Sequence, residues 1–258
     1  MYKLNRTGEE KLNNFGSKMI IVKYNSCRDI DVYFPQYNYT IKHRKYEYFS
    51  KGEIRCPYEP TVYNIGYLGE GKYKSKINGK FTRCYTTWRS MLNRCYNERL
   101  KQKHTYYKDC EVCEEWHNFQ NFANWYYDNY YEIKNECMHL DKDILIKNNK
   151  IYSPKTCVFA PQRINTLFTK CNKNRGKLPI GVKLEKYNKY SSSCSTYDFE
   201  ENKQIRVHLG YYDTPKKAFE VYKKFKEKYI KEVADYYKES IPQNLYNAMY
   251  SYIVDIND

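Results

Sequence analysis

The chain of 258 residues contains no apolar run long enough to cross a membrane, and its mean hydropathy is −0.95. A membrane-spanning helix needs about 20 predominantly apolar residues, so this class of protein is excluded. Residues 1–14 also lack the apolar core of a secretory signal peptide. No amphipathic helix with a clean basic face is evident, which argues against binding to a membrane surface. We therefore expect a cytoplasmic protein with no membrane partner.

Disulfide and zinc frameworks are also poorly supported. The chain has ten cysteines, but in the cytoplasm we expect them to be reduced thiols. Cys110 and Cys113 have the spacing of half a zinc site, which normally needs a second close pair of cysteines or histidines. The remaining cysteines around this segment form no such pair: Cys95, Cys137, Cys157 and Cys171. We therefore expect these cysteines to be small buried apolar side chains, and structural Zn²⁺ is the less favoured alternative.

Acidic residues are the minority among the charged residues. Thirty Asp and Glu stand against 45 Lys and Arg, which gives a net charge of +15 and a pI near 9.1. Such a balance favours a polyanionic partner, most often nucleic acid. The glycine-rich segment 65–72 lacks the Lys-Ser/Thr pair of a phosphate-binding P-loop. We interpret it as a linker, with a domain boundary near 64–80.

The first half of the chain is predicted to change from strands to helices. Residues 19–24, 30–34, 39–46 and 48–54 are strand-like, so residues 1–75 should form a small barrel or curled sheet without a helix. Apolar residues at helical spacing predict helices over 83–96 and 114–127.

Residues 138–168 predict a compact ββα unit. Residues 138–146 and 156–160 have strand patterns, and the polar segment 147–150 between them has the composition of a tight turn. Pro161 is expected to open a helix, because proline is tolerated in the first helical turn. This arrangement would bring Asp141 on the first strand close to Asn165 on the helix.

These residues resemble the HNH (ββα-metal) nucleases. The matching blocks are Leu140-Asp141-Lys142-Asp143, then Tyr152-Ser153-Pro154-Lys155-Thr156-Cys157-Val158-Phe159, then Asn165, with upstream blocks at Trp88, Met91, Arg94-Cys95-Tyr96, Val112-Cys113, Trp116 and Phe119-Gln120-Asn121-Phe122. The resemblance spans roughly residues 88–168. The segments IVKY, DIDVYF and YEYFSKGEI are more weakly similar to a module that precedes phage HNH proteins.

The resemblance implies hydrolysis of DNA assisted by Mg²⁺ (or Mn²⁺). Asp141 and Asn165 would be the metal ligands, since hard cations prefer oxygen ligands. A base beside the metal would deprotonate the attacking water. Lys142 stands where the family has His or Arg, and Thr156 where it has Asn. Because lysine is a poor base near neutrality, His139 on the same strand face is an alternative base, and His117 is another.

The C-terminal part has the order of three strands and a helix. Strands are predicted over 180–186, 190–199 and 204–209, followed by a helix from Pro215 with Thr214 as its N-cap. With the landmarks RGKLPIGV and IRVHLGYYDTPKKAFEVY, this part resembles the APETALA-type DNA-binding domain over roughly 175–230. The resemblance implies a sheet that contacts guanine edges and phosphates. The candidate contacts are Arg175, Lys177, Lys183, Lys186, Lys189, Tyr190, Arg206 and His208.

Together these patterns predict an α+β protein with three domains. Residues 1–75 would be a β-rich module, 76–172 the HNH nuclease-like domain with its flanking helices, and 173–258 the APETALA-type domain with C-terminal helices broken at Pro242. The predicted function is a phage-type, homing-like DNA endonuclease acting on double-stranded DNA in the host cell cytoplasm, with a homodimer suggested by analogy with palindromic cutters. The alternative is a DNA-binding regulator whose HNH unit has lost its chemistry. An RNA-binding protein is less favoured, because no RNA-module motif is present.

Overall fold

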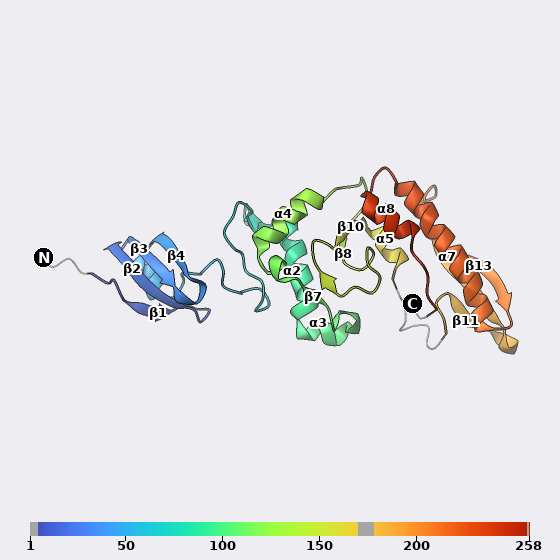
Figure 1. The fold of residues 1–258 in the computed structure, drawn as a ribbon, viewed down its shortest axis with the longest axis horizontal. Coiled ribbons are helices and arrows are strands. Elements are labelled where there is room, and N and C mark those ends of the chain that lie inside the picture. Colours follow the sequence, from blue (N-terminus) through green and yellow to red (C-terminus); the bar gives the residue numbers. More distant parts are fainter. Residues whose placement is uncertain (1–4, 170–177, 257) are drawn as a thin grey trace. The chain divides into compact units, whose positions relative to one another are not determined.

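The computed structural model describes residues 5–169, 178–256 and 258, and the chain has a mixed α+β structure with several small sheets (Figure 1). The chain divides into two compact units. The first comprises Met1–Asn129 and Lys150–Pro154, and the second Tyr130–Asn149 and Lys155–Asp258. The division into three domains stays a prediction. No helix in the described part of the chain has the length and apolarity that a membrane span needs.

The first unit begins with a four-stranded antiparallel sheet of order β1-β2-β3-β4. Its strands are β1 (Glu10–Leu12), β2 (Lys18–Ser26), β3 (Asp29–Phe34) and β4 (Tyr39–Arg44), and a short 3-10 helix (Pro35–Tyr37) joins the last two. The expected strands over 19–24, 30–34 and 39–46 are therefore present. The expectation of no helix is wrong, because Tyr46–Ser50 form α1 and place Phe49 in the core of the sheet.

The glycine-rich segment 65–72, which the sequence suggested to be a linker, is hydrogen-bonded to the chain that leads into α4. The Tyr67 N–H donates to the His117 carbonyl, and the Phe119 N–H donates to the Tyr67 carbonyl, both at 2.9 Å. A Cβ on Gly69 would lie 2.2 Å from Oδ1 of Asn118, and its φ of 65° also favours glycine there. These glycines allow the segment to pack closely against the chain that leads into α4.

Helices form the rest of the first unit: α2 (Arg83–Tyr96), α3 (Glu98–Lys103) and α4 (Phe119–Asn129), with 3-10 turns at Thr105–Tyr107 and Glu114–His117 and a hairpin of β5 (Lys76–Ile77) and β6 (Lys80–Phe81). The prediction for 83–96 is confirmed, and the Thr82 side chain accepts the Tyr85 N–H as N-cap. The helix predicted over 114–127 is interrupted at Asn118, whose extended backbone pairs with Tyr67. The Trp88 indole N–H donates to the Trp116 carbonyl at 2.7 Å and ties α2 to this turn.

Residues 138–167 fold as strand, loop, strand and helix. In the second unit β8 (Met138–Asp141) pairs antiparallel with β10 (Val158–Pro161), and α5 (Gln162–Leu167) follows. Both strands are shorter than predicted, and Pro161 ends β10 and acts as the N-cap residue of α5 instead of being its first residue. In the first unit β9 (Ile151–Tyr152) pairs parallel with β7 (Glu111–Val112), which the sequence did not predict.

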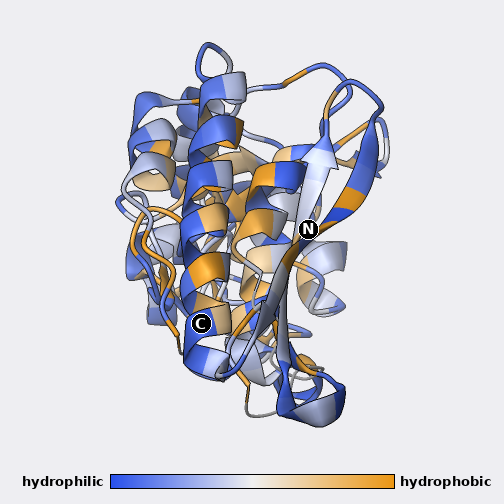
Figure 2. Ribbon diagram, turned by 90° about the vertical axis from the view of Figure 1, so that its right-hand side faces the viewer, coloured by the Kyte–Doolittle hydropathy of each residue, from blue (hydrophilic) through white to orange (hydrophobic). Residues whose placement is uncertain are grey.

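The second unit ends with a three-stranded antiparallel sheet and two helices. The sheet has the order β11 (Val182–Leu184), β12 (Tyr190–Asp198) and β13 (Lys203–Tyr212), with a 3-10 turn at Lys186–Asn188, and is followed by α7 (Pro215–Tyr237) and α8 (Gln243–Tyr250). Thr214 caps α7 as predicted, accepting the Lys217 N–H at 3.3 Å. The helix continues to Tyr237, before the break expected at Pro242, and Tyr229, Ile230 and Val233 extend its buried side. Hydrophobic and hydrophilic residues alternate along the helical ribbons in Figure 2.

Candidate active site and a basic sheet face

The strand β8 presents two different faces. Met138 and Leu140 are buried, whereas His139 and Asp141 alternate with them and are partly exposed. Asp141 pairs with Val158 and His139 with Ala160. Directly paired residues of an antiparallel ladder project to the same side of the sheet, so Val158 and Ala160 share the face of His139 and Asp141.

The helix α5 covers this same face of the hairpin. Val158 and Ala160 belong to one buried cluster with Ile164 of α5. Asn165 follows Ile164 on that helix and is partly exposed. The topology therefore places the two predicted metal ligands, Asp141 and Asn165, on elements that meet on one side of the β8–β10 hairpin. The two side chains are not hydrogen-bonded to each other.

The carboxylate of Asp141 organises the backbone that follows β8. Its Oδ1 accepts the N–H groups of Asp143 and Ile144, both at 2.8 Å, and this turn ends the strand. Burial, together with the nearby Asp143 carboxylate, raises the pKa of Asp141 to about 6. A cation bound here would offset the repulsion between the two carboxylates. Because the available donors are oxygen atoms, the residues fit Mg²⁺ or Mn²⁺.

Lys142 is buried and its charge is paired. Its Nζ lies 3.1 Å from Oδ2 of Asp143, with which it forms an ion pair. The Lys142 carbonyl accepts the Asn149 side-chain amide at 2.7 Å. An ammonium held in an ion pair has no lone pair to accept a proton from water. This arrangement favours His139 over Lys142 as the base.

The other base candidate, His117, lies in the first unit and is held by its surroundings. Its Nε2 is 3.1 Å from the Val112 carbonyl and 3.5 Å from the Tyr96 hydroxyl. The thiol of Cys110 donates to the Tyr106 carbonyl at 3.7 Å, and burial raises the pKa of the Cys113 thiol. Within the described chain, no cysteine belongs to a group of three metal-ligating side chains.

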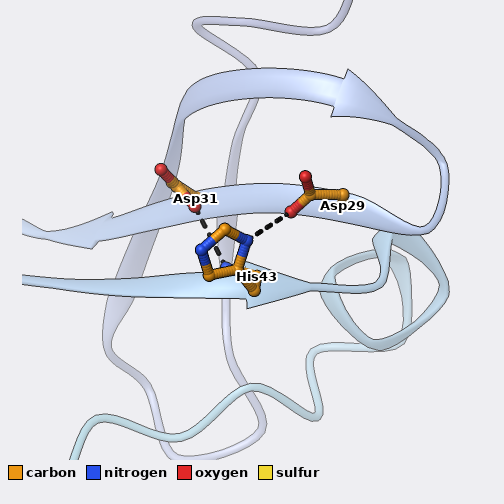
Figure 3. A group of neighbouring side chains, drawn as sticks. All are labelled: Asp29, Asp31 and His43. Atoms are coloured by element: carbon orange, nitrogen blue, oxygen red, sulfur yellow. Dashed lines mark hydrogen bonds and ion pairs between the residues drawn. The ribbon is translucent and has the colours of Figure 1, made fainter.

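One such group does occur, in the N-terminal sheet, and the sequence analysis missed it. Ligand atoms of Asp29, Asp31 and His43 lie within 4.8 Å of one another (Figure 3). Two residues of β4, Lys42 and His43, oppose the single residue Asp31, which is the pattern of a β-bulge. The carboxylate of Asp31 accepts the His43 N–H, and the His43 ring bonds to Asp29, each at 3.0 Å. Hydrogen bonds within the bulge thus account for the cluster.

The C-terminal sheet has one buried and one exposed face. Val182 and Cys194 face the core formed with α7. By strand register, the opposite face includes six side chains that are exposed, apart from the half-buried Ser193: Lys183, Ser193, Ser195, Arg206, His208 and Tyr211. Of the predicted contacts, Lys183, Arg206 and His208 therefore lie together on one face.

Side chains on this face are ordered by one another. The guanidinium of Arg206 donates to Oγ of Ser193 through Nε at 3.2 Å and Nη2 at 2.9 Å. The rings of His208 and Tyr211 lie 4.7 Å apart. Ser193 of β12 therefore holds the Arg206 side chain of β13 in place, a role that the sequence did not indicate.

Tyr190, another predicted contact, lies on the other face and is partly buried against the core formed with α7. Tyr211, which is 65% exposed, lies on the outward face. Tyr211 reaches the outward face because of a bulge at Leu209, where Ser192 pairs with Gly210 and Ser193 with His208. Gly210, with φ of 119°, is the sequence signal of this irregularity.

The remaining predicted contacts are near the sheet or outside the description. Lys186 and Lys189 are exposed in the turn between β11 and β12, and Lys189 forms an ion pair with Asp213. Lys183 lies 3.2 Å from the Glu185 carboxylate. Arg175 and Lys177 lie outside the described residues.

Comparison of the chain with models of protein families, with curated proteins and with solved structures gave no match.

Proposed function

We propose that this protein is a metal-dependent DNA endonuclease of the HNH type that hydrolyses phosphodiester bonds. The observation that carries the proposal is the placement of Asp141 and Asn165 on β8 and α5, which meet on one face of the hairpin. The proposal includes a finer architecture: a β-rich N-terminal part, a ββα-metal unit with flanking helices, and a DNA-reading C-terminal sheet. The proposed location is the host cell cytoplasm.

The residues of the site divide the chemistry between them. Asp141 and Asn165 would hold one Mg²⁺ (or Mn²⁺), which would supply stabilisation of negative charge on the leaving oxygen. His139, on the same face of β8 as Asp141, accepts the proton of the attacking water. Lys142 keeps Asp143 paired, which holds the turn after Asp141 in place.

The proposed DNA contacts combine positive charge with a side chain that is already oriented. The net charge of +15 favours the phosphate backbone, and the outward sheet face offers Lys183, Arg206 and His208. Arg206 reaches DNA already oriented by Ser193, so less side-chain freedom is lost on binding.

Cleavage of supercoiled plasmid tests the enzyme. The wild-type protein is incubated with Mg²⁺, Mn²⁺ or EDTA, beside Asp141→Asn, Asn165→Ala and His139→Ala. We expect cleavage with either metal and its loss in the Asp141 and Asn165 variants. Asp128→Asn, which changes the same charge at an exposed position of α4, is the matched control and should cleave normally. Whether the product is nicked or linear DNA, together with the mass of the protein in solution, tests the proposed homodimer.

The second candidate is a DNA-binding regulator with a degenerate HNH unit. The ion pair of Lys142 with Asp143 favours it, because this pair occupies the position where the family has its His or Arg. Both candidates predict DNA binding that weakens with salt. Plasmid that stays intact with every metal, despite salt-dependent binding, would establish the regulator and reject the enzyme.

A further inference from the structure

The turn between β11 and β12 exposes an aromatic side chain almost completely. Tyr187 is 93% exposed, more than any other large hydrophobic residue in the described chain. With its described neighbours it forms no hydrogen bond, ion pair or ring contact. Its ring therefore contributes nothing to the packing of the unit.

The backbone at Tyr187 is one that tyrosine rarely adopts. Tyr187 has φ of 58° and ψ of 34°, and Asn188 has φ of 55°. The Lys189 N–H donates to the Lys186 carbonyl at 3.4 Å across them. Two central residues of positive φ are the pattern of a type I′ hairpin turn, which favours Asn, Asp or Gly at both positions. Tyrosine at the first position disfavours the turn, so the turn itself gives no reason for the ring.

The surroundings of Tyr187 are basic, and they lie at one end of the sheet. Lys186 and Lys189 flank it and are exposed. The turn follows the pair Leu184 and Tyr190, and the next row of the ladder ends at Tyr211 on the outward face. An exposed ring between lysines, next to a sheet face with arginine and histidine, matches the chemistry of a nucleic-acid strand. Lysines neutralise phosphates, and an aromatic ring stacks on a base.

We propose that Tyr187 is a stacking wedge, which inserts at an unstacked base at one end of the DNA segment that the sheet contacts. The proposal rests on the DNA binding of the proposed function and specifies its substrate: duplex DNA with a base step that opens easily. Side chains inserted between base steps unstack and kink the duplex, and the bend brings more of the protein into contact.

The test compares two 30-base-pair duplexes in EDTA, one fully paired and one with a single bulged 2-aminopurine. Fluorescence anisotropy gives the two dissociation constants, and 2-aminopurine fluorescence reports stacking on the bulged base. For the wild type we expect tighter binding of the bulged duplex by about tenfold, as one base–aromatic stack provides, with a fall in 2-aminopurine emission.

Three variants separate the ring from the charge and from the turn. Tyr187→Phe should keep the preference, because it keeps the ring. Tyr187→Asn should lose it while unfolding at the same or a higher temperature, since Asn suits the turn. Lys186→Ala should weaken binding of both duplexes by a similar factor and leave the preference intact.

The outcomes distinguish this inference from the proposed function. Equal binding of the two duplexes by the wild type, or a preference that survives Tyr187→Asn, overturns the wedge and leaves the nuclease to the plasmid assay. Binding to neither duplex overturns both. A preference that is lost in Tyr187→Asn, in a protein that cleaves no plasmid, supports the wedge and rejects the nuclease.

Discussion

The Oδ1 atom of Asp141 accepts the backbone N–H of Ile144 at 2.8 Å, so the proposed metal ligand also forms the turn that ends β8. Structural and chemical roles of this carboxylate can be separated by substitution. Asp141→Asn keeps an oxygen acceptor for the N–H groups of Asp143 and Ile144, whereas Asp141→Ala leaves both without this partner. We expect the alanine variant to be less stable than the asparagine variant by about 1–3 kcal/mol in urea unfolding. Both should be inactive on plasmid; equal stability would show that the turn does not depend on the carboxylate.

The raised pKa of Asp141 predicts that Asp141→Asn gains stability relative to the wild type as the pH rises. Burial and the Asp143 carboxylate raise the pKa to about 6, above the value of an unfolded chain. The folded protein thus binds the proton of the Asp141 carboxyl more tightly than the unfolded chain does. This tighter binding stabilises the folded protein fully below about pH 4, and the stabilisation is lost as the pH rises through about 6. The stability of Asp141→Asn relative to wild type should therefore increase between pH 4 and pH 7. Urea midpoints across this range measure it, and a constant difference would contradict the prediction.

The glycine-rich segment predicts a sharp difference between two Gly→Ala substitutions. Gly69 and Gly79 both have positive φ, but only at Gly69 would the new Cβ meet another atom, Oδ1 of Asn118 at 2.2 Å. Gly79→Ala should cost about 1 kcal/mol from backbone strain alone. Gly69→Ala should cost about 3 kcal/mol, since overpacking adds to the strain. Thermal unfolding of the two variants measures the difference, and similar costs would mean that the segment is not packed as described.

A buried lysine offers a route to stabilise the second unit. Lys226 of α7 is buried against the ring of Tyr229, and desolvation lowers its pKa. The unfolded chain therefore binds the ammonium proton of Lys226 more tightly than the folded protein does. The lysine destabilises the folded state at neutral pH, and the stability of the protein rises as the pH rises toward about 10.4. Lys226→Met should raise stability at pH 7 by about 1 kcal/mol, as replacing a buried charge by an apolar side chain of similar volume does. The gain should shrink by pH 10; a gain that does not change with pH would point to packing instead.

Because Arg206 is hydrogen-bonded to Ser193, substitutions of the two residues should affect DNA binding differently. Arg206→Ala removes a phosphate or base contact, so the slope of log affinity against log salt concentration should fall by about one if the contact is to phosphate. Ser193→Ala leaves the charge but frees the guanidinium, and should weaken binding about threefold to tenfold with an unchanged slope. Anisotropy titrations at salt concentrations from about 50 to about 200 mM resolve the two effects. An unchanged affinity in both variants would remove this face from the DNA interface.

Local signals were enough to predict much of the fold. The α2 helix was predicted because one side of it is apolar, and the order of β11, β12, β13 and α7 followed from alternation and the Thr214-Pro215 start. What failed depends on distant partners. The parallel strands β7 and β9 have two residues each and no pattern of their own.

The candidate site shows the same limit on a smaller scale. The alternation of β8 correctly placed His139 beside Asp141, but no pattern revealed that the Asp141 side chain ends the strand. Likewise, strict alternation along β13 from Arg206 and His208 would place Tyr212 on the outward face, but the bulge at Leu209 places Tyr211 there. Neither feature can be recognised without knowing the partners of these residues.

The five residues Lys150–Pro154 return to the first unit after the chain has already entered the second. The Cys113 N–H donates to the Tyr152 carbonyl, and the Tyr152 hydroxyl accepts from Arg94. A truncated protein that stops at Asn129 would therefore lack a strand that its own fold needs, and on the ribosome this unit could not finish folding until part of the next had emerged. Dissecting the protein into working fragments will need a cut elsewhere, or a linker that carries β9 back to β7.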